Sequence, residues 1–219
     1  MQLTPEINFL SIVVVGNFNP IIITPQWLAL KQLIRESESE DARIELIHPD
    51  ITRFELDWFK FEAQHAKLEF TCTKESHFVS LKDLVLSIFA ILKETPITAV
   101  GLNHTCHFSL RSVEEYINFG YWLSPVKQFS DVLKDPRLIQ ITFLETGNPS
   151  NEAGTLKVQI LPSDVMTDRK SVMFVHNLHF DEGSLKKADW LINLIIQKWD
   201  ESFDRVRKFN DKIWEIAQF

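Results

Sequence analysis

The last part of the chain carries its longest periodic pattern, with apolar residues recurring every three or four positions over residues 184–219. This is the spacing of one face of an α-helix. The apolar positions are Ala188, Leu191, Ile192, Ile195, Trp199, Phe203, Val206, Phe209, Ile213 and Ile216. They predict a helix of about 30 residues, capped by Ser184 and roughly 45 Å long. We expect most of the preceding chain to form the surface on which this helix lies.

Before this helix, strand-like and helix-like patterns alternate. A β-branched run at residues 8–15 predicts a buried strand, and Thr24 with Pro25 predicts the start of a helix that ends before the polar stretch 36–41. Period-two alternation then predicts strands at 43–48, 52–61 and 66–73. The alternation changes phase at Trp58 and Phe59, which indicates a β-bulge or a bend. Ser80 is expected to cap a helix over 80–93.

The same order of elements begins again at residue 97. The patterns predict a strand at 97–110, helices at 112–123 and 125–133, strands at 137–144, 154–161 and 171–180, and then the long helix. Val15-Gly16 matches Val100-Gly101 at an offset of 85 residues. The repeated order fits either an internal duplication or a topology that merely occurs twice.

These patterns predict an α+β fold of two β-α-β-β-β-α halves, residues 1–96 and 97–219, joined in one compact unit. Strands with one polar face, together with helices that each carry one apolar stripe, favour a curved antiparallel sheet of about eight strands with all helices on one face. This element order resembles the helix-grip and TATA-binding-protein-like architectures. The resemblance covers the whole chain and rests on element order alone.

Composition limits the possible functions. The net charge of −7 argues against a broad phosphate-binding surface, so nucleic acid is not expected as a partner. Cys72 and Cys106 lie within strand-like runs and are interpreted as reduced core thiols. The sequence shows no signal-peptide pattern and no apolar run of about 18 residues, so we expect a cytoplasmic protein of bacterial type with no membrane partner.

Two histidines and two cysteines are the candidate metal ligands. His104 and Cys106 share one face of a predicted strand, His107 takes the other face, and His176 falls in phase with apolar residues of the last strand. With Cys72, these residues could form a zinc site. Ligands isolated on separate strands are untypical of structural zinc motifs, and buried core side chains explain the same residues, so no metal is assigned.

Catalytic signatures are lacking in the sequence. There is no phosphate-binding loop, dinucleotide fingerprint or nucleophile elbow. A thiol at Cys106 beside His104 or His107 would lie in an apolar run, which raises a thiol pKa. We therefore assign no catalytic residue and no cofactor.

The end of the long helix is the candidate partner-binding surface. It extends beyond the helix that closes the first half, and it carries large apolar side chains to the terminus of the sequence. The candidate residues are Phe203, Val206, Phe209, Ile213, Trp214, Ile216 and Phe219. The alternative is that they pack on Trp27 or on Tyr121 and Trp122 of the same chain.

The sequence therefore predicts a non-enzymatic interaction or assembly subunit that uses its C-terminal helix, with a homodimer as one form of that assembly. Two alternatives stay open. A helix-grip protein could enclose a small apolar ligand between sheet and helix, although abundant Phe and Trp side chains favour a filled core. A metal-dependent or thiol-dependent enzyme is the third hypothesis.

Overall fold

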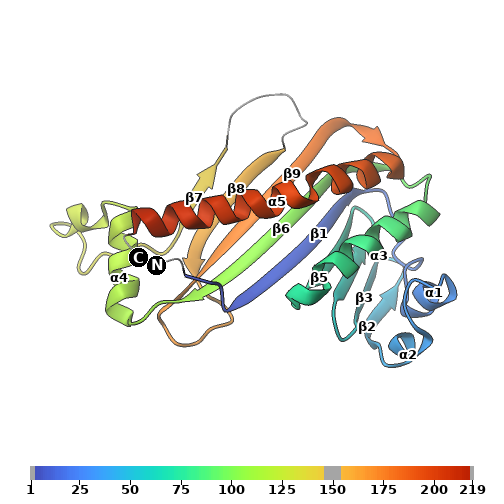
Figure 1. The fold of residues 1–219 in the computed structure, drawn as a ribbon, viewed down its shortest axis with the longest axis horizontal. Helices are drawn as coiled ribbons and strands as arrows, with labels where there is room; N and C mark the ends of the chain where they lie inside the picture. The colour runs from blue at the N-terminus through green and yellow to red at the C-terminus, as the bar shows by residue number, and fades with distance from the viewer. Residues whose placement is uncertain (1–2, 146–153, 218–219) are drawn as a thin grey trace.

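The computed structural model describes residues 3–145 and 154–217 and shows an α+β fold, in which a long C-terminal helix lies across a large antiparallel sheet (Figure 1). Nine strands form the sheet in the order β2-β3-β4-β5-β1-β6-β9-β8-β7. Their bounds are β1 (Ile7–Gly16), β2 (Arg43–His48), β3 (Ile51–Glu55), β4 (Lys60–Gln64), β5 (Lys67–Cys72), β6 (Ile97–Ser109), β7 (Ile141–Leu144), β8 (Thr155–Pro162) and β9 (Ser171–Lys186).

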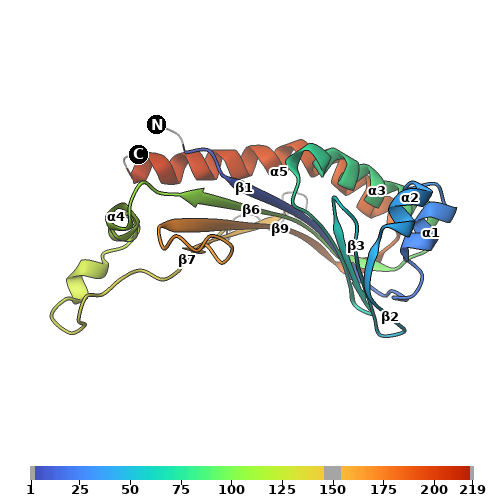
Figure 2. The same cartoon turned by 90° about the horizontal axis from the view of Figure 1, so that it is seen from below.

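The helices differ widely in length. They are α1 (Pro25–Leu30), α2 (Glu36–Glu40), α3 (Phe78–Ile91), α4 (Val113–Leu123) and α5 (Ala188–Ile216), with 3₁₀ turns η1 (Glu75–His77) and η2 (Val126–Phe129). The two longest helices, α3 and α5, cover one face of the curved sheet, whereas α1 and α2 lie at one end of the molecule and α4 lies at the other (Figure 2).

The centre of the sheet is the antiparallel pair of β1 and β6, matched from Ile7 with His107 to Gly16 with Ile97. Strand β1 continues to β5 on one side, and β6 continues to β9 on the other. The first strand of each predicted half therefore lies innermost, beside the first strand of the other half. The pairing joins both predicted halves into one continuous sheet.

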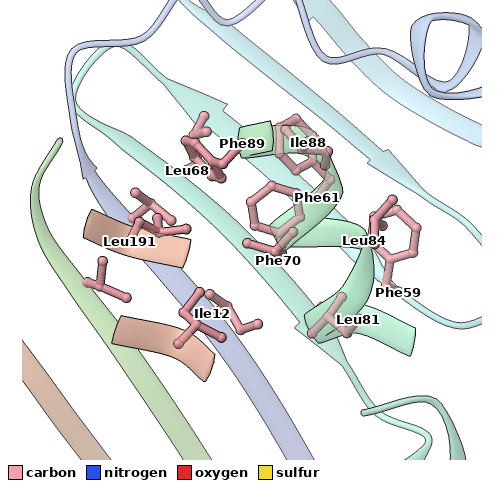
Figure 3. Close-up of a cluster of buried hydrophobic side chains, with 14 of the residues drawn as sticks. Ile12, Phe59, Phe61, Leu68, Phe70, Leu81, Leu84, Ile88, Phe89 and Leu191 are labelled. Carbon is pink, nitrogen blue, oxygen red and sulfur yellow. The ribbon is translucent and has the colours of Figure 1, made fainter. Parts of the chain in front are cut away.

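Two clusters of buried side chains fill the space between the sheet and its helices. Under α3, Phe61 and Phe70 stack with ring centroids 4.9 Å apart, among aliphatic side chains from β1 and α5 (Figure 3). The second cluster lies beneath the end of α5 and includes Phe108, Phe174 and Trp214. Burial alternates along β5 and β8 as the sequence pattern predicted, because one face of these strands is packed and the other is not. Edge strand β2 differs: all of its residues are exposed.

Local capping chemistry explains two helix starts that the sequence predicted. The Thr24 hydroxyl accepts a hydrogen bond from the backbone N–H of Trp27 at 3.1 Å, and Pro25 occupies the first turn of α1. The Ser112 hydroxyl accepts from the N–H of Glu115 at 3.1 Å at the start of α4. In both cases a side-chain oxygen satisfies an amide that has no partner within the helix.

The predicted strand at 52–61 is wrong, because the chain turns within it. The backbone N–H of Leu56 donates to the carbonyl of Phe59 at 2.9 Å, and β3 and β4 pair on either side of this turn. The phase change at Trp58 and Phe59 therefore marks a hairpin turn, which gives nine strands where eight were expected.

Two predicted helix starts are also misplaced. The long helix begins at Ala188 with Lys187 as its cap, because β9 runs on to Lys186, which pairs with Ile97 of β6. Ser184 therefore belongs to the strand. Helix α3 begins at Phe78 after the turn η1, and so Ser80 lies inside the helix. Phe78 is buried, which explains why the helix extends to include it.

Three shorter elements differ from the prediction as well. Helix α1 ends at Leu30, Gln32 adopts a positive φ of 59°, and the polar stretch after it forms the short helix α2. Only 126–129 of the predicted helix 125–133 is helical, as a 3₁₀ turn. Strand β7 begins at Ile141, four residues later than expected, because 137–140 have no strand partner in the sheet.

None of the helices in the described part of the chain is long and apolar enough to cross a lipid bilayer.

We expect Phe70→Ala to lower the free energy of unfolding by about 3–5 kcal/mol, because it empties a fully buried site between β5 and α3. Chemical denaturation followed by far-ultraviolet circular dichroism measures this loss. Val79→Ala, on the exposed side of α3 at 55% exposure, is the control and should change the free energy by no more than about 0.5 kcal/mol. Equal effects of the two substitutions would contradict the assigned core.

Candidate functional site

A groove opens on the helix-covered face of the sheet, beside the later part of α5. It lies between α5 and the segment that leads into β1, and Phe78 is the one residue of α3 in its lining. The groove encloses about 550 Å³. This volume lies within the range of about 300–1,000 Å³ that is usual for small-molecule sites. A smaller hollow of about 330 Å³ near the end of α3 is lined by no titratable side chain.

Strand β6 forms the floor of the groove. Its alternate residues His104, Cys106 and Phe108 point to the helix-covered face, as the sequence predicted for the first two. His107 points to the opposite face, where its Nδ1 atom lies 2.9 Å from the hydroxyl of Ser163. The floor therefore combines an imidazole, a thiol and an aromatic ring.

The walls come from three other segments. Helix α5 contributes Phe203, Val206 and Asn210. The segment before β1 contributes Leu3, Thr4 and Pro5, and the region where η1 meets α3 contributes Glu75 and Phe78. The rings of Phe78 and Phe203, 6.2 Å apart, bring α3 and α5 together at one end of the groove. The lining is mixed: apolar side chains and the Cys106 thiol make up half of its residues, and polar or charged side chains make up the other half.

The mouth of the groove is acidic. Its charged side chains are Glu75, Asp204, Arg207 and Asp211. Arg207 donates to the carboxylate of Asp204 at 2.7 Å, which leaves two carboxylates beyond this ion pair. Glu75 accepts a hydrogen bond from the side-chain amide of Asn8 at 3.0 Å. The four charged side chains at the mouth therefore carry a net charge equal to two negative charges.

Beneath α5, two buried histidines pair with polar residues of the helix. His104 and His176 lie opposite each other in the β6–β9 pair. The His104 Nε2 atom lies 3.2 Å from the Ser202 hydroxyl, which donates its own hydrogen to the carbonyl of Trp199 at 2.7 Å. Because that hydroxyl has used its hydrogen, His104 must carry a proton on Nε2 and donate it.

The second histidine has the same tautomer. His176 Nε2 lies 2.9 Å from Asn210 Oδ1, an acceptor, while the Asn210 amide donates toward the Cys106 sulfur at 3.8 Å. The other ring nitrogen of His176, Nδ1, is buried without a hydrogen-bond partner among the described residues. Asn210 thus joins the buried histidine to the floor of the groove.

Burial makes these groups resistant to ionisation. It lowers the pKa of His104 to about 3, with a further lowering from nearby His176. Burial also lowers the pKa of His176 to about 4, against the opposing effect of its hydrogen bond with Asn210. Burial raises the pKa of the Cys106 thiol to about 11. Both imidazoles are therefore neutral at physiological pH, and the thiol remains protonated and a poor nucleophile.

The candidate metal ligands are only partly brought together. His104, Cys106 and His176 are neighbours under α5, but Cys72 lies on β5, separated from β6 by β1, and its thiol donates to the Lys74 carbonyl at 3.3 Å. Within residues 3–145 and 154–217, no group of three or more His, Cys, Asp or Glu side chains could hold a metal ion.

The candidate partner residues on α5 mostly face the core of their own chain. Trp214 is only 1% exposed, with its ring about 5 Å from the rings of Phe108 and Phe174. Val206 and Ile213 are buried in the same cluster, while Phe203 and Phe209 are half-buried. Ile216 is 48% exposed, and Phe219 lies outside the described residues. Binding of a partner by these residues remains a prediction.

Several residues of the site were not predicted from the sequence. Ser202 and Asn210 lie on the buried line of α5, which runs through Ile195, Trp199, Ser202, Val206, Asn210 and Ile213. The signal that could have found them is a polar residue recurring at three-to-four spacing within an apolar stripe. No comparable pattern in the sequence marks Leu3 and Glu75, because they join the groove only through the packing of segments that are distant in sequence.

No protein-family model matches this chain, and a search of curated proteins finds no match.

We expect the free energy of unfolding to fall by about 2 kcal/mol for each of His104 and His176 between pH 7 and pH 5. Below pH 6.5 these histidines bind protons in the unfolded chain but stay neutral in the folded chain. The free energy of unfolding therefore decreases as the pH is lowered. Thermal melts across this range measure the slope, and His104→Gln should reduce it by about half. Cys106→Ala perturbs the same layer without removing an imidazole and should keep the slope; a slope unchanged in His104→Gln would contradict the assignment.

We expect Trp214→Ala to cost about 3–5 kcal/mol, because its ring fills the second core cluster. The loss should be the same at protein concentrations tenfold apart, since the contacts lie within one chain. Ile216→Ala, on the exposed side of the same turn, is the control. A loss that appears only at high concentration would instead assign Trp214 to a partner interface.

Proposed function

We propose that this protein is a non-enzymatic binding protein whose groove between α5 and the segment leading into β1 holds a small ligand with an apolar body and a positively charged end. The observation that carries the proposal is the groove itself, which combines apolar side chains on its floor and walls with an acidic mouth. Concave apolar sites with a few fixed polar groups are the usual form of small-molecule sites.

The apolar body of the ligand is inferred from the lining. Phe78, Phe203 and Val206 present apolar surface on two sides, and Phe108 adds a ring to the floor. Burial of apolar ligand surface against such groups contributes about 25 cal/mol for each Å² removed from water. The neutral imidazole and thiol of the floor can accept such a ligand without desolvating a charge.

The charge of the ligand is inferred from the mouth. Glu75 and Asp211 remain as carboxylates beyond the Asp204–Arg207 ion pair. Exposed charge pairs contribute only about 0.2–1 kcal/mol each. Two such contacts therefore supply a preference of roughly tenfold for a cationic over a neutral ligand, since about 1.4 kcal/mol corresponds to a factor of ten.

A second candidate function is the assembly subunit expected from the sequence. It is favoured by the exposed apolar side chains between α4 and β7: Val113, Trp122, Phe129, Val132, Leu133, Ile139 and Leu144. Contiguous exposed apolar surface is typical of protein interfaces. In this version of the proposal the contact surface lies in that segment, since most of the apolar side chains at the end of α5 are already packed.

We also propose a helix-grip arrangement that arose by duplication. Two features support it. Strands β1 and β6 are an adjacent antiparallel pair at the centre of the sheet, and each predicted half ends in a helix that covers the sheet, α3 in the first half and α5 in the second. The halves also differ. Four strands follow β1 but three follow β6, and Gly16 ends its strand whereas Gly101 lies within one.

We expect octylamine to bind about tenfold more tightly than octanol, and octanoate to bind more weakly than either. The three probes share one alkyl chain and differ in the charge of the head group, and isothermal titration calorimetry measures their affinities. Glu75→Gln and Asp211→Asn should each lower the affinity for octylamine about threefold and leave that for octanol unchanged.

The matched control is Glu215→Gln, which removes one negative charge from α5 outside the groove, where it pairs with Lys212. It should leave all three affinities unchanged. Equal affinity for amine and carboxylate would refute the assigned ligand charge, and absence of binding by all three probes would refute a ligand site for alkyl chains in this groove.

A further inference from the structure

The two edges of the sheet are built differently. Edge strand β2 carries Arg43, Glu45 and His48, and its register with β3 shifts between Ile44 and Leu46. Charged side chains and bulges are devices that prevent edge strands from pairing with other chains. Edge strand β7 has neither: Ile141–Leu144 and the three residues before it, Leu-Ile-Gln, carry no charge, and the register of β7 with β8 is continuous.

The backbone of β7 offers hydrogen-bonding groups on its outer side. The N–H of Glu145 donates to the carbonyl of Leu156 in β8 at 2.9 Å. In an antiparallel pair, alternate residues point their backbone groups toward the partner. Ile141 and Phe143 therefore bond to β8, while Thr142 and Leu144 point outward. Within the described part of the chain, no strand pairs with this outer side.

This edge is complementary to itself. A two-fold axis through Thr142 would place it opposite Thr142 of a second copy, as a hydrogen-bonded pair. Ile141 would then face Phe143, and Gln140 would face Leu144, on both sides of the axis. Threonine pairs and pairs of aromatic with β-branched residues are among the favourable cross-strand contacts.

Apolar side chains around the edge would also be covered. Ile139 is 76% exposed and Leu144 is 58% exposed, on either side of Thr142. Phe143 is half-buried, with its ring 5.4 Å from that of Phe209 on α5, so the edge is continuous with the core. An uncharged seam also suits two copies that each carry a net charge of −7, because it brings no like charges into contact.

We propose that the protein forms a two-fold homodimer by antiparallel pairing of β7 with β7 of a second copy, which extends the sheet across the dimer. The partner is a second copy because a two-fold axis at Thr142 satisfies the outward backbone groups of both strands at once. The inference is independent of the proposed ligand groove, which lies on the other flank of α5, beside α3 (Figure 1).

Sedimentation velocity on the full chain tests the proposal, with an expected mass twice the 25.5 kDa of one chain. Thr142→Pro should shift the protein to monomer, since it removes an outward N–H while leaving the bonds to β8 in place. Thr142→Val keeps the strand and should stay dimeric. Ile47→Pro, at the opposite edge, should also stay dimeric.

Hydrogen exchange gives a readout that does not depend on a variant. The amides of Thr142 and Leu144 should become at least tenfold more protected when the protein is concentrated from monomer to dimer, whereas amides of β2 should not change. Thr142→Lys, which places two like charges directly opposite each other on the two-fold axis, serves as a second variant if Thr142→Pro does not fold. A monomeric wild-type protein, a dimer that both variants leave intact, or a dimer lost on Ile47→Pro would overturn the proposal.

Discussion

The structure depends on the contact between α5 and the sheet, which runs through both core clusters. From Ala188 to Trp199 the helix packs on the cluster beneath α3, and from Val206 to Ile213 it packs on the cluster at the end of β6. The side chains of α5 interdigitate with those of the sheet, which already fixes the helix in place. The hydrogen bonds from His104 to Ser202 and from His176 to Asn210 reinforce this register. A slide would leave buried imidazoles without partners, at about 1–3 kcal/mol each.

The fixed register of α5 also shapes the groove. Asn210 holds His176 with its carbonyl oxygen and reaches toward Cys106 with its amide, so the same residue sets the helix register and lines the groove. Burial keeps the imidazoles neutral, which confines the charges of the groove to its mouth. The interior of the groove is therefore uncharged because the polar groups under α5 are too deeply buried to ionise, whereas the acidity of the rim comes from Glu75 and Asp211.

The sequence was informative where one face of an element is packed and the other is not. Alternation located most of the strands, and Thr24 with Pro25 located the start of α1. The turn between β3 and β4 was missed because it contains no Gly or Pro, and its one turn-favouring residue, Asp57, lies within an alternating pattern that continues up to Trp58. The start of α5 was missed because β9 continues past Gly183, whose positive φ of 65° lets the chain turn without ending the strand.

The groove could not be predicted from the sequence, because it exists only where distant segments diverge. Its floor residues His104 and Cys106 were singled out for their chemistry, but as candidate metal ligands with Cys72, which lies beyond β1. Residues near the N-terminus, such as Leu3, and Glu75 before α3 join the site only through the curvature of the sheet. Apolar side chains late in α5, such as Trp214, suggested a partner because sequence alone cannot show the surface that covers them.

The groove and the β7 edge lie on opposite flanks of α5, yet a chain of contacts connects them. Phe143 of β7 packs on Phe209, Phe209 meets the ring of His176, and His176 bonds to Asn210 in the groove wall. Contact alone does not transmit a signal, because coupling requires an element with two arrangements that both sites bias. The polar contacts of α5 favour a single register. If the groove binds a ligand and β7 pairs with a second copy, as proposed, this single register gives the two sites no shared two-state element through which to couple.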